Sequence, residues 1–170
     1  MNAALARWNV LPASEAAEEI LPCCGSQRWA HALVRLRPFP DQESLLEKSD
    51  EVWLELGPAD WGEAFFSHPR IGEKKAPDSA TVKSAQWSNE EQSSVVLSGE
   101  DIQERLRHAN GEYERRFGRI FIVCATGKSA EQMLAIVERR LNNDEPEELY
   151  EAAEQQRQIT QLRLRKWLEL

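Results

Sequence analysis

Hydrophobic side chains recur at helical spacing along most of the chain. Trp29, Leu33 and Leu36 lie at positions i, i+4 and i+7, which places them on one face of a helix over residues 26–37. The same periodicity, interrupted by turn residues, predicts further helices over 14–21, 41–57, 58–67, 88–97, 102–117, 129–141 and 146–167. Residues 119–125 include the β-branched Ile120, Ile122 and Val123 and predict one short extended segment. We therefore expect an all-α fold, a single-domain bundle over 1–170 with about eight helices and that segment.

Polar residues mark where some of these helices begin. Ser129 and Gln132 have the spacing of a capping box, in which each side chain bonds the backbone N–H at the other position. Ser88 and Glu91 have the same Ser-x-x-Glu spacing, which predicts a helix that starts at Ser88. Before it, residues 69–86 contain two prolines and a glycine, and predict a long polar loop.

Composition and charge narrow the class of protein. The chain has 170 residues, of which 41% are hydrophobic and 29% charged, as is typical of a soluble globular protein. Its longest apolar run, 120–125, is far shorter than the roughly 20 residues that span a bilayer, so we expect no membrane partner. A formal net charge of −8 disfavours a polyphosphate partner, so we expect no nucleic acid.

Cysteines and histidines lack the spacing of a disulfide framework or a metal site. Cys23, Cys24 and Cys124 are odd in number and form no Cys-x-x-Cys pair, which indicates a reduced, cytoplasmic chain. No basic stretch precedes an apolar one at the start, so we expect no secretory leader. The three histidines show neither HxxxH nor HExxH spacing, so we expect no metal.

His68 is the first candidate for chemistry, because it stands where a predicted helix stops and the rigid Pro69 follows. Histidine both takes and gives a proton near neutral pH, and a fixed backbone would hold its ring in place. The alternative is that His68 only caps the helix or lies in a solvated loop.

Ser88, Glu91 and Gln92 form a second candidate group. On spacing alone they are a helix-capping device. The same residues would also suit a polar ligand, because a helix N-terminus attracts anions and a carboxylate next to an amide supplies acceptors and donors.

Two further stretches have both a structural and a functional interpretation. Phe121, Ile122, Val123, Cys124 and Ala125 are most simply a buried strand, but an unpaired edge would offer backbone groups to an amide-like ligand. Arg163 lies among apolar neighbours; it is either solvated or turned inward toward an anionic or carbonyl partner.

Two other classes of function stay open from the residues alone. A helical domain of this size can hold a partner helix in an apolar groove. A thiol enzyme would need a cysteine with a lowered pKa beside a base, and no local pattern around Cys23 or Cys24 indicates one. Buried packing is the simpler explanation for these thiols.

Taken in order, the motifs resemble the OHCU decarboxylase family, whose substrate is 2-oxo-4-hydroxy-4-carboxy-5-ureidoimidazoline. The resemblance runs from about residue 21 to 164, and its strongest parts are His-Pro, Ser-x-x-Glu-Gln and Leu-Arg-Leu. The matching stretches are Cys23-Cys24-Gly25-Ser26, Trp29-Ala30, Arg37-Pro38-Phe39, His68 to Gly72, Ser88 to Gln92, Asn110, Tyr113, Phe117-Gly118, Phe121 to Ala125, and Ile159 with Leu162-Arg163-Leu164. Some members carry an acidic and a small residue after His-Pro, where this chain has Arg70, and residues 73–86 do not align.

The resemblance implies an all-helical, cofactor-free decarboxylase of urate breakdown that releases S-allantoin and carbon dioxide from a small-molecule substrate. His68 would be the catalytic acid/base. Relatives suggest a homodimer. The implied substrate-binding residues are Pro69, Ser88, Glu91, Gln92, Phe121, Ile122, Val123, Cys124, Ala125 and Arg163.

Overall fold

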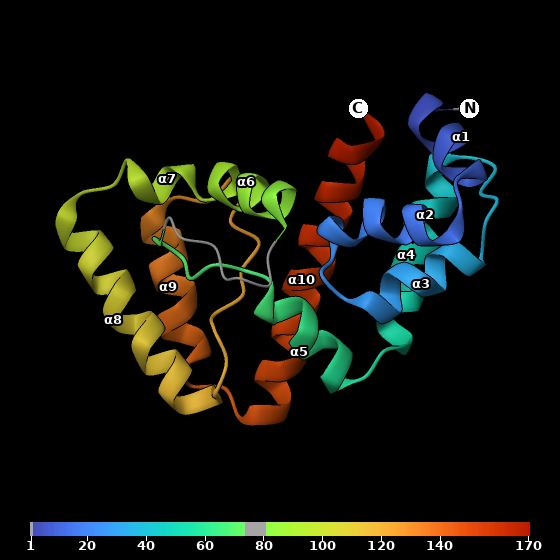
Figure 1. The fold of residues 1–170 in the computed structure, drawn as a ribbon. Helices are drawn as coiled ribbons and strands as arrows, with labels where there is room; N and C mark the ends of the chain where they lie inside the picture. Colours follow the sequence, from blue (N-terminus) through green and yellow to red (C-terminus); the bar gives the residue numbers. More distant parts are fainter. Residues whose placement is uncertain (1, 74–80) are drawn as a thin grey trace. The chain divides into compact units, whose positions relative to one another are not determined.

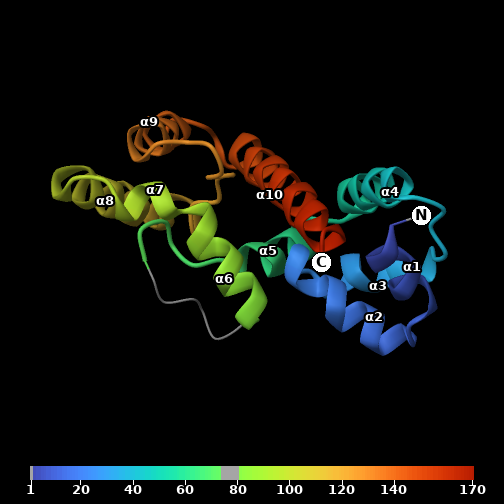
Figure 2. The ribbon, with the colours of Figure 1, turned by 90° about the horizontal axis from the view of Figure 1, so that it is seen from above.

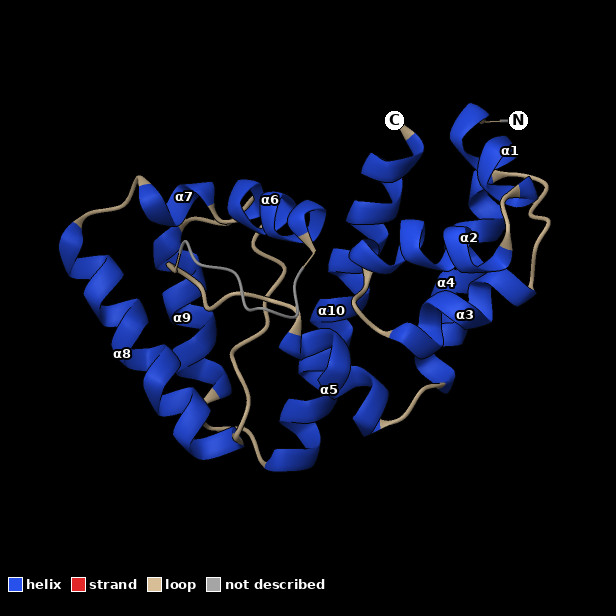
Figure 3. Cartoon of the chain, viewed as in Figure 1, coloured by secondary structure: helices blue, strands red, loops and turns tan. Residues whose placement is uncertain are grey.

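The computed structural model describes residues 2–73 and 81–170, and the predicted all-α class is confirmed. These residues form ten α-helices and one 3-10 helix and contain no strand (Figure 3). The predicted count of about eight omitted α1 (Ala3–Val10) and the short α7 (Ser93–Val96). By their internal contacts, the residues divide into a first unit, Met1–Ala64 with Arg157–Leu170, and a second unit, Phe65–Gln156. That 1–170 acts as one domain stays a prediction.

The first unit is built around tryptophans. Trp8 and Trp29 are fully buried, and Trp8 packs edge-on against Trp167 with ring centroids 5.8 Å apart. Each indole also has a hydrogen-bond acceptor: Trp8 donates to the carbonyl of Ala16 at 2.9 Å and Trp29 to the hydroxyl of Ser49 at 3.3 Å. Besides α1 and the end of α10 (Glu145–Leu168), the unit contains α2 (Ala13–Ile20), η1 (Leu21–Cys23), α3 (Gln27–Arg35), α4 (Gln42–Glu55) and most of α5 (Pro58–Phe66) (Figures 1 and 2).

The second unit is centred on α8 (Glu100–Phe117) and α9 (Ala130–Arg140), which lie side by side in both views (Figures 1 and 2). Their facing side chains, among them Leu106, Tyr113 and Met133, are buried. Gly118 ends α8 with a φ of +66°, a left-handed conformation that glycine adopts without strain. The predicted capping box of Ser129 and Gln132 is confirmed at the start of α9.

The predicted helix over 88–97 is wrong in its start and its continuity, because residues 88–91 end a helix that begins earlier and residues 93–96 form α7. The part of the predicted loop that covers 82–86 is wrong as well. Helix α6 runs over Val82–Glu91, and its N-cap is Thr81, whose hydroxyl accepts from the Ser84 N–H at 3.1 Å. Ser88 lies inside this helix and is only 2% exposed. The buried face of α6 carries Ser84 and Ser88 beside Trp87, so the helix lacks the apolar stripe by which hydrophobic periodicity detects a helix. Residues 74–80 of that loop lie outside the described residues.

Candidate functional site

His68 is buried in the second unit just beyond the end of α5. Its side chain is 9% exposed and its backbone N–H donates to the carbonyl of Phe65 at 3.1 Å. Its Nε2 lies 2.7 Å from Oε1 of Gln156, on α10. An amide oxygen only accepts hydrogen bonds, so Nε2 carries the proton and the lone pair of the neutral ring is on Nδ1. The ring is therefore held by a partner and is not a solvated loop residue.

The loop after Pro69 is fixed by two amide side chains from neighbouring helices. Gly72 has a φ of +89°, and its N–H donates to Oε1 of Gln92 at 3.0 Å. The carbonyl of Ile71 accepts from Nδ2 of Asn110, on α8, at 3.0 Å. Gln92 thus has a structural role that the sequence did not predict, because it shapes the loop that follows the histidine.

Arg70, the residue that departs from some members of the family, pairs with Glu114 of α8. Its Nε and Nη2 reach the two carboxylate oxygens at 2.5 and 3.0 Å. The hydrogen bond and charge of Glu114 raise the pKa of Arg70. The arginine side chain is 48% exposed, so solvent screens this ion pair and it adds little to the free energy of unfolding. Its two parallel hydrogen bonds instead orient the loop against α8.

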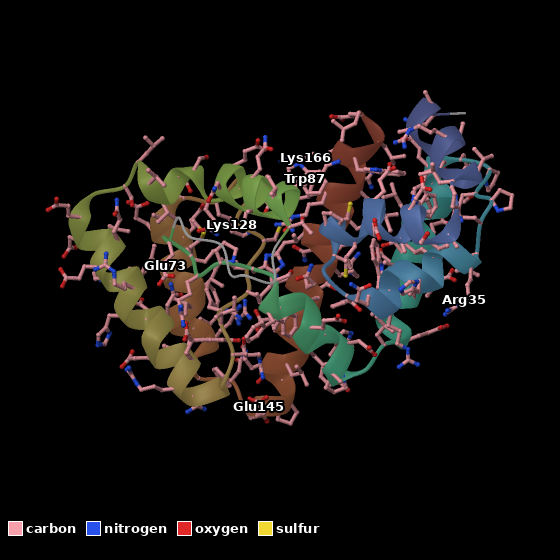
Figure 4. All side chains as sticks on the ribbon, in the orientation of Figure 1. Arg35, Glu73, Trp87, Lys128, Glu145 and Lys166 are labelled. Atoms are coloured by element: carbon pink, nitrogen blue, oxygen red, sulfur yellow. The ribbon has the colours of Figure 1, made fainter. Side chains whose placement is uncertain are left out.

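The extended segment 121–125 is buried, and side chains rather than a strand hold it. Oε1 of Gln155 accepts from the Cys124 N–H at 2.9 Å, and Nζ of Lys128 donates to the Cys124 carbonyl at 2.6 Å (Lys128 is labelled in Figure 4). Among the described residues, none forms a hydrogen bond with the N–H groups of Ile122 and Val123. Buried backbone N–H groups are nearly always hydrogen-bonded, so these two are the candidate donors of the segment.

A buried ion pair supports the segment from α9 and α10. Arg140 and Glu148 are both fully buried, with Nε–Oε1 and Nη2–Oε1 distances of 3.0 and 2.5 Å. Nη1 of Arg140 donates to the carbonyl of Ile122 at 2.7 Å, and the Tyr113 hydroxyl donates to Glu148 at 2.5 Å. Burial and this hydrogen bond raise the pKa of Tyr113. No pattern in the sequence predicts this pair, because arginines and glutamates at helix ends are usually solvated.

The three polar residues of the Ser-x-x-Glu-Gln motif lie at the C-terminal end of α6. Ser88 is buried, Glu91 is the last helical residue and is half-buried, and Gln92 is the C-cap with 8% exposure. The argument that a helix N-terminus would attract an anion here is therefore wrong, since this end of a helix presents carbonyls.

Arg163 belongs to the first unit and is 1% exposed, so the solvated alternative is wrong. Its Nη1 donates to the carbonyl of Pro22 at 3.3 Å. Cys24 lies in its electrostatic reach, yet burial raises the pKa of that thiol to about 12 despite the guanidinium. That Arg163 contributes to the substrate site stays a prediction.

Cys24 does not have the properties of a nucleophile. Cys23, Cys24 and Cys124 are all buried and free of disulfides. A thiol pKa of about 12 leaves almost no thiolate at neutral pH, whereas a catalytic cysteine needs a lowered pKa. Cys24 is therefore a packing residue.

Residues 2–73 and 81–170 contain neither a metal-binding group nor a membrane-spanning helix. No three His, Cys, Asp or Glu side chains in these ranges come together as a metal-binding group would require. None of the helices in the same ranges is both long and apolar enough to cross a membrane.

The chain is similar to known proteins over almost its whole length. A family model described as OHCU decarboxylase matches residues 9–165. The chain is 31% identical over 144 residues, 85% of its length, to "Uric acid degradation bifunctional protein TTL" of Arabidopsis thaliana, of which it covers only 44%. It is also 27% identical over 128 residues to the "2-oxo-4-hydroxy-4-carboxy-5-ureidoimidazoline decarboxylase" of Amia calva. The aligned region covers 75% of this chain and 73% of that protein.

A solved structure agrees with these sequence matches. It is described as an OHCU decarboxylase in the presence of (S)-allantoin, and it is 30% identical to this chain with a TM-score of 0.76. The match covers 90% of this chain and 99% of that one, so the same arrangement of helices carries the sequence similarity. The chain belongs to the OHCU decarboxylase family.

Proposed function

We propose that this chain is a cofactor-free decarboxylase that converts 2-oxo-4-hydroxy-4-carboxy-5-ureidoimidazoline to S-allantoin and carbon dioxide in urate breakdown. Membership of the family supports the reaction, and relatives are named for uric acid degradation and for this decarboxylation. The observation that carries the proposal is the buried pair of His68 and Gln156, with Nε2 and Oε1 2.7 Å apart. This hydrogen bond holds the ring of the proposed acid/base in one position.

The second unit brings the histidine and the extended segment to consecutive residues of one helix. Gln156 bonds His68, and Gln155 bonds the Cys124 N–H. Both glutamines lie on α10, so the imidazole and the backbone of Cys124 converge on the same stretch of helix. A small substrate that lies between them would meet the proposed acid/base and backbone N–H groups together.

Decarboxylation needs stabilisation of charge rather than a strong nucleophile. Loss of carbon dioxide leaves an electron pair on the ring carbon, which must delocalise into the adjacent π system. Donors aimed at that charge lower the barrier, and the N–H groups of Ile122 and Val123 would supply them. His68 would then deliver a proton to one face of the product, which gives a single enantiomer.

The other site residues would bind and orient the substrate. Glu91 and the amide nitrogen of Gln92 would hold the ureido and hydroxyl groups, while Oε1 of Gln92 keeps its bond to Gly72. The remaining lining groups of the proposed site are Pro69, Ser88, Phe121, Cys124 and Ala125. A cytoplasmic location and a homodimer belong to the same proposal.

The test couples the purified protein to substrate freshly made from urate by oxidation and hydrolysis. The circular dichroism of the allantoin then reports both the rate and the enantiomer. We expect wild type to form one optically active product and His68→Asn to be slower by about a hundredfold or more, the usual effect of losing a general acid/base. The matched control is His108→Asn, because the His108 side chain is 72% exposed and its Nδ1 lies 3.7 Å from Glu112 of its own helix.

Two results would contradict the proposal. Racemic allantoin formed at the rate without protein would mean that the chain lacks this activity. Undiminished turnover by folded His68→Asn would mean that the histidine is not the acid/base.

A further inference from the structure

The side chain of Gln156 is completely buried, although it is polar and belongs to a helix rich in charged residues. Burying an amide is costly unless it is hydrogen-bonded. Its Oε1 accepts from Nε2 of His68 at 2.7 Å, so part of that cost is recovered by a bond to the candidate catalytic histidine.

The two residues are 88 positions apart in sequence, so only the fold of the second unit brings them together. Nε2 of a neutral imidazole is protonated in one of two tautomers, and a neighbour that only accepts selects that one. Gln156 presents its oxygen, so it favours the tautomer with the proton on Nε2. The atom of the neutral ring that can take a proton from a substrate, or later return it, is then Nδ1.

We propose that Gln156 is a positioning residue that fixes the tautomer and orientation of the His68 ring. The proposal rests on the proposed function of His68, and it adds a residue that the family resemblance did not supply. Gln156 acts through the histidine and need not touch the substrate.

The effect on catalysis should appear mainly in kcat. Partners that orient a functional histidine typically contribute about 10- to 100-fold to activity. Gln156→Leu removes the acceptor with little change in volume, so we expect kcat to fall by about 10- to 100-fold while KM changes little. Gln156→Glu keeps an oxygen that can accept from Nε2, so we expect its kcat to lie above that of the leucine variant.

A spectroscopic measurement separates positioning from a general loss of structure. The chain has three histidines, so two-bond proton–nitrogen spectra of histidine-labelled protein are assigned by comparison with His68→Asn. We expect wild type and Gln156→Glu to show the Nε2–H pattern for His68. Gln156→Leu should show a smaller share of the Nε2–H tautomer than wild type. The matched control is Gln132→Leu, which changes an exposed glutamine that caps α9.

The outcomes distinguish this proposal from the proposed function. An Nδ1–H pattern in wild type, or the same pattern in wild type and Gln156→Leu, would overturn the positioning role even if His68 is catalytic. If Gln156→Leu changes the tautomer and leaves kcat unchanged, the positioning role in catalysis is overturned as well. Loss of the His68 role itself is seen separately, in the turnover of His68→Asn.

Discussion

The buried Arg140–Glu148 pair offers a sharp test of what holds the candidate site together. Both side chains have no exposed surface, and their nitrogen–oxygen distances are 2.5 and 3.0 Å. Removal of either partner leaves the other charge buried without its nearest counter-charge (Glu151 lies 3.9 Å from Arg140), which costs about 3–5 kcal/mol. Arg140→Met also leaves the carbonyl of Ile122 without its donor, which adds about 1–3 kcal/mol. Glu148→Met leaves the buried Tyr113 hydroxyl without its acceptor in the same way, so we expect the two single variants to be destabilised to a similar extent.

The double variant should be less destabilised than the sum of the single variants. When both charges are removed, no unpaired charge remains, so we expect a coupling free energy of at least about 2 kcal/mol between Arg140 and Glu148. The matched control is the exposed pair of Arg105 and Glu138, with a separation of 3.4 Å and both side chains 53% exposed. Its coupling should be below about 0.5 kcal/mol because water and salt screen it.

Urea unfolding followed by far-ultraviolet circular dichroism measures these free energies in the second unit. Tryptophan fluorescence would be a poorer probe, because Trp87 is the only one of the six tryptophans within that unit. Single variants that lose less than about 1 kcal/mol, or a coupling no larger than that of the exposed pair, would refute the reasoning. If Arg140→Met does not fold, Arg140→Lys keeps the positive charge and tests the loss of the paired Nε and Nη2 hydrogen bonds to Glu148.

Three other predictions follow from the described residues. Burial raises the pKa of the Cys24 thiol from about 9 to about 12. The thiol therefore contributes fully to the free energy of unfolding below pH 9, and this contribution decreases by up to about 1.4 kcal/mol per pH unit above it. Unfolding of wild type and Cys24→Ala from about pH 8 to 11 compares how steeply the free energy of unfolding of each falls with pH. Thr81→Ala should destabilise by about 1 kcal/mol in thermal unfolding because it removes the α6 N-cap, and equal stability would contradict the boundary. Iodoacetamide at pH 7 should leave native turnover intact while labelling all three cysteines in urea, and rapid inactivation would support a thiol mechanism.

The sequence predicted those helices whose buried face is apolar. The stripe of Leu106, Ala109 and Tyr113 identified α8, and Gly118 marked its end. Helix α6 was misplaced because Ser84 and Ser88 occupy its buried face, and periodicity of hydrophobic residues cannot detect a face of small polar ones. The apparent capping box at Ser88 is a coincidence of spacing, since Thr81 supplies the cap seven residues earlier.

The candidate site was predicted only where its residues carry an unusual local pattern. His68 was found because a proline follows it, and the extended segment because it is a β-branched run. Gln155, Gln156 and Arg140 have no such pattern, since glutamine and arginine are ordinary helix-forming residues. Whether such a residue is solvated or buried is decided by tertiary packing, so only the structure identifies it.

Three of the polar side chains that shape this site, Gln155, Gln156 and Arg140, lie outside the motifs that carry the family resemblance. Gln155 and Arg140 hold the extended segment, Gln92 and Asn110 hold the loop after Pro69, and Gln156 holds the histidine. Each bond joins a rigid helix to a segment without regular structure, so the helices fix groups that the backbone of those segments alone would leave mobile. A site that must stabilise charge without a cofactor depends on donors that are already in place, because reorganisation during the reaction would cost the stabilisation they provide. The buried amides of this unit are therefore as much a requirement of the proposed chemistry as the histidine they surround.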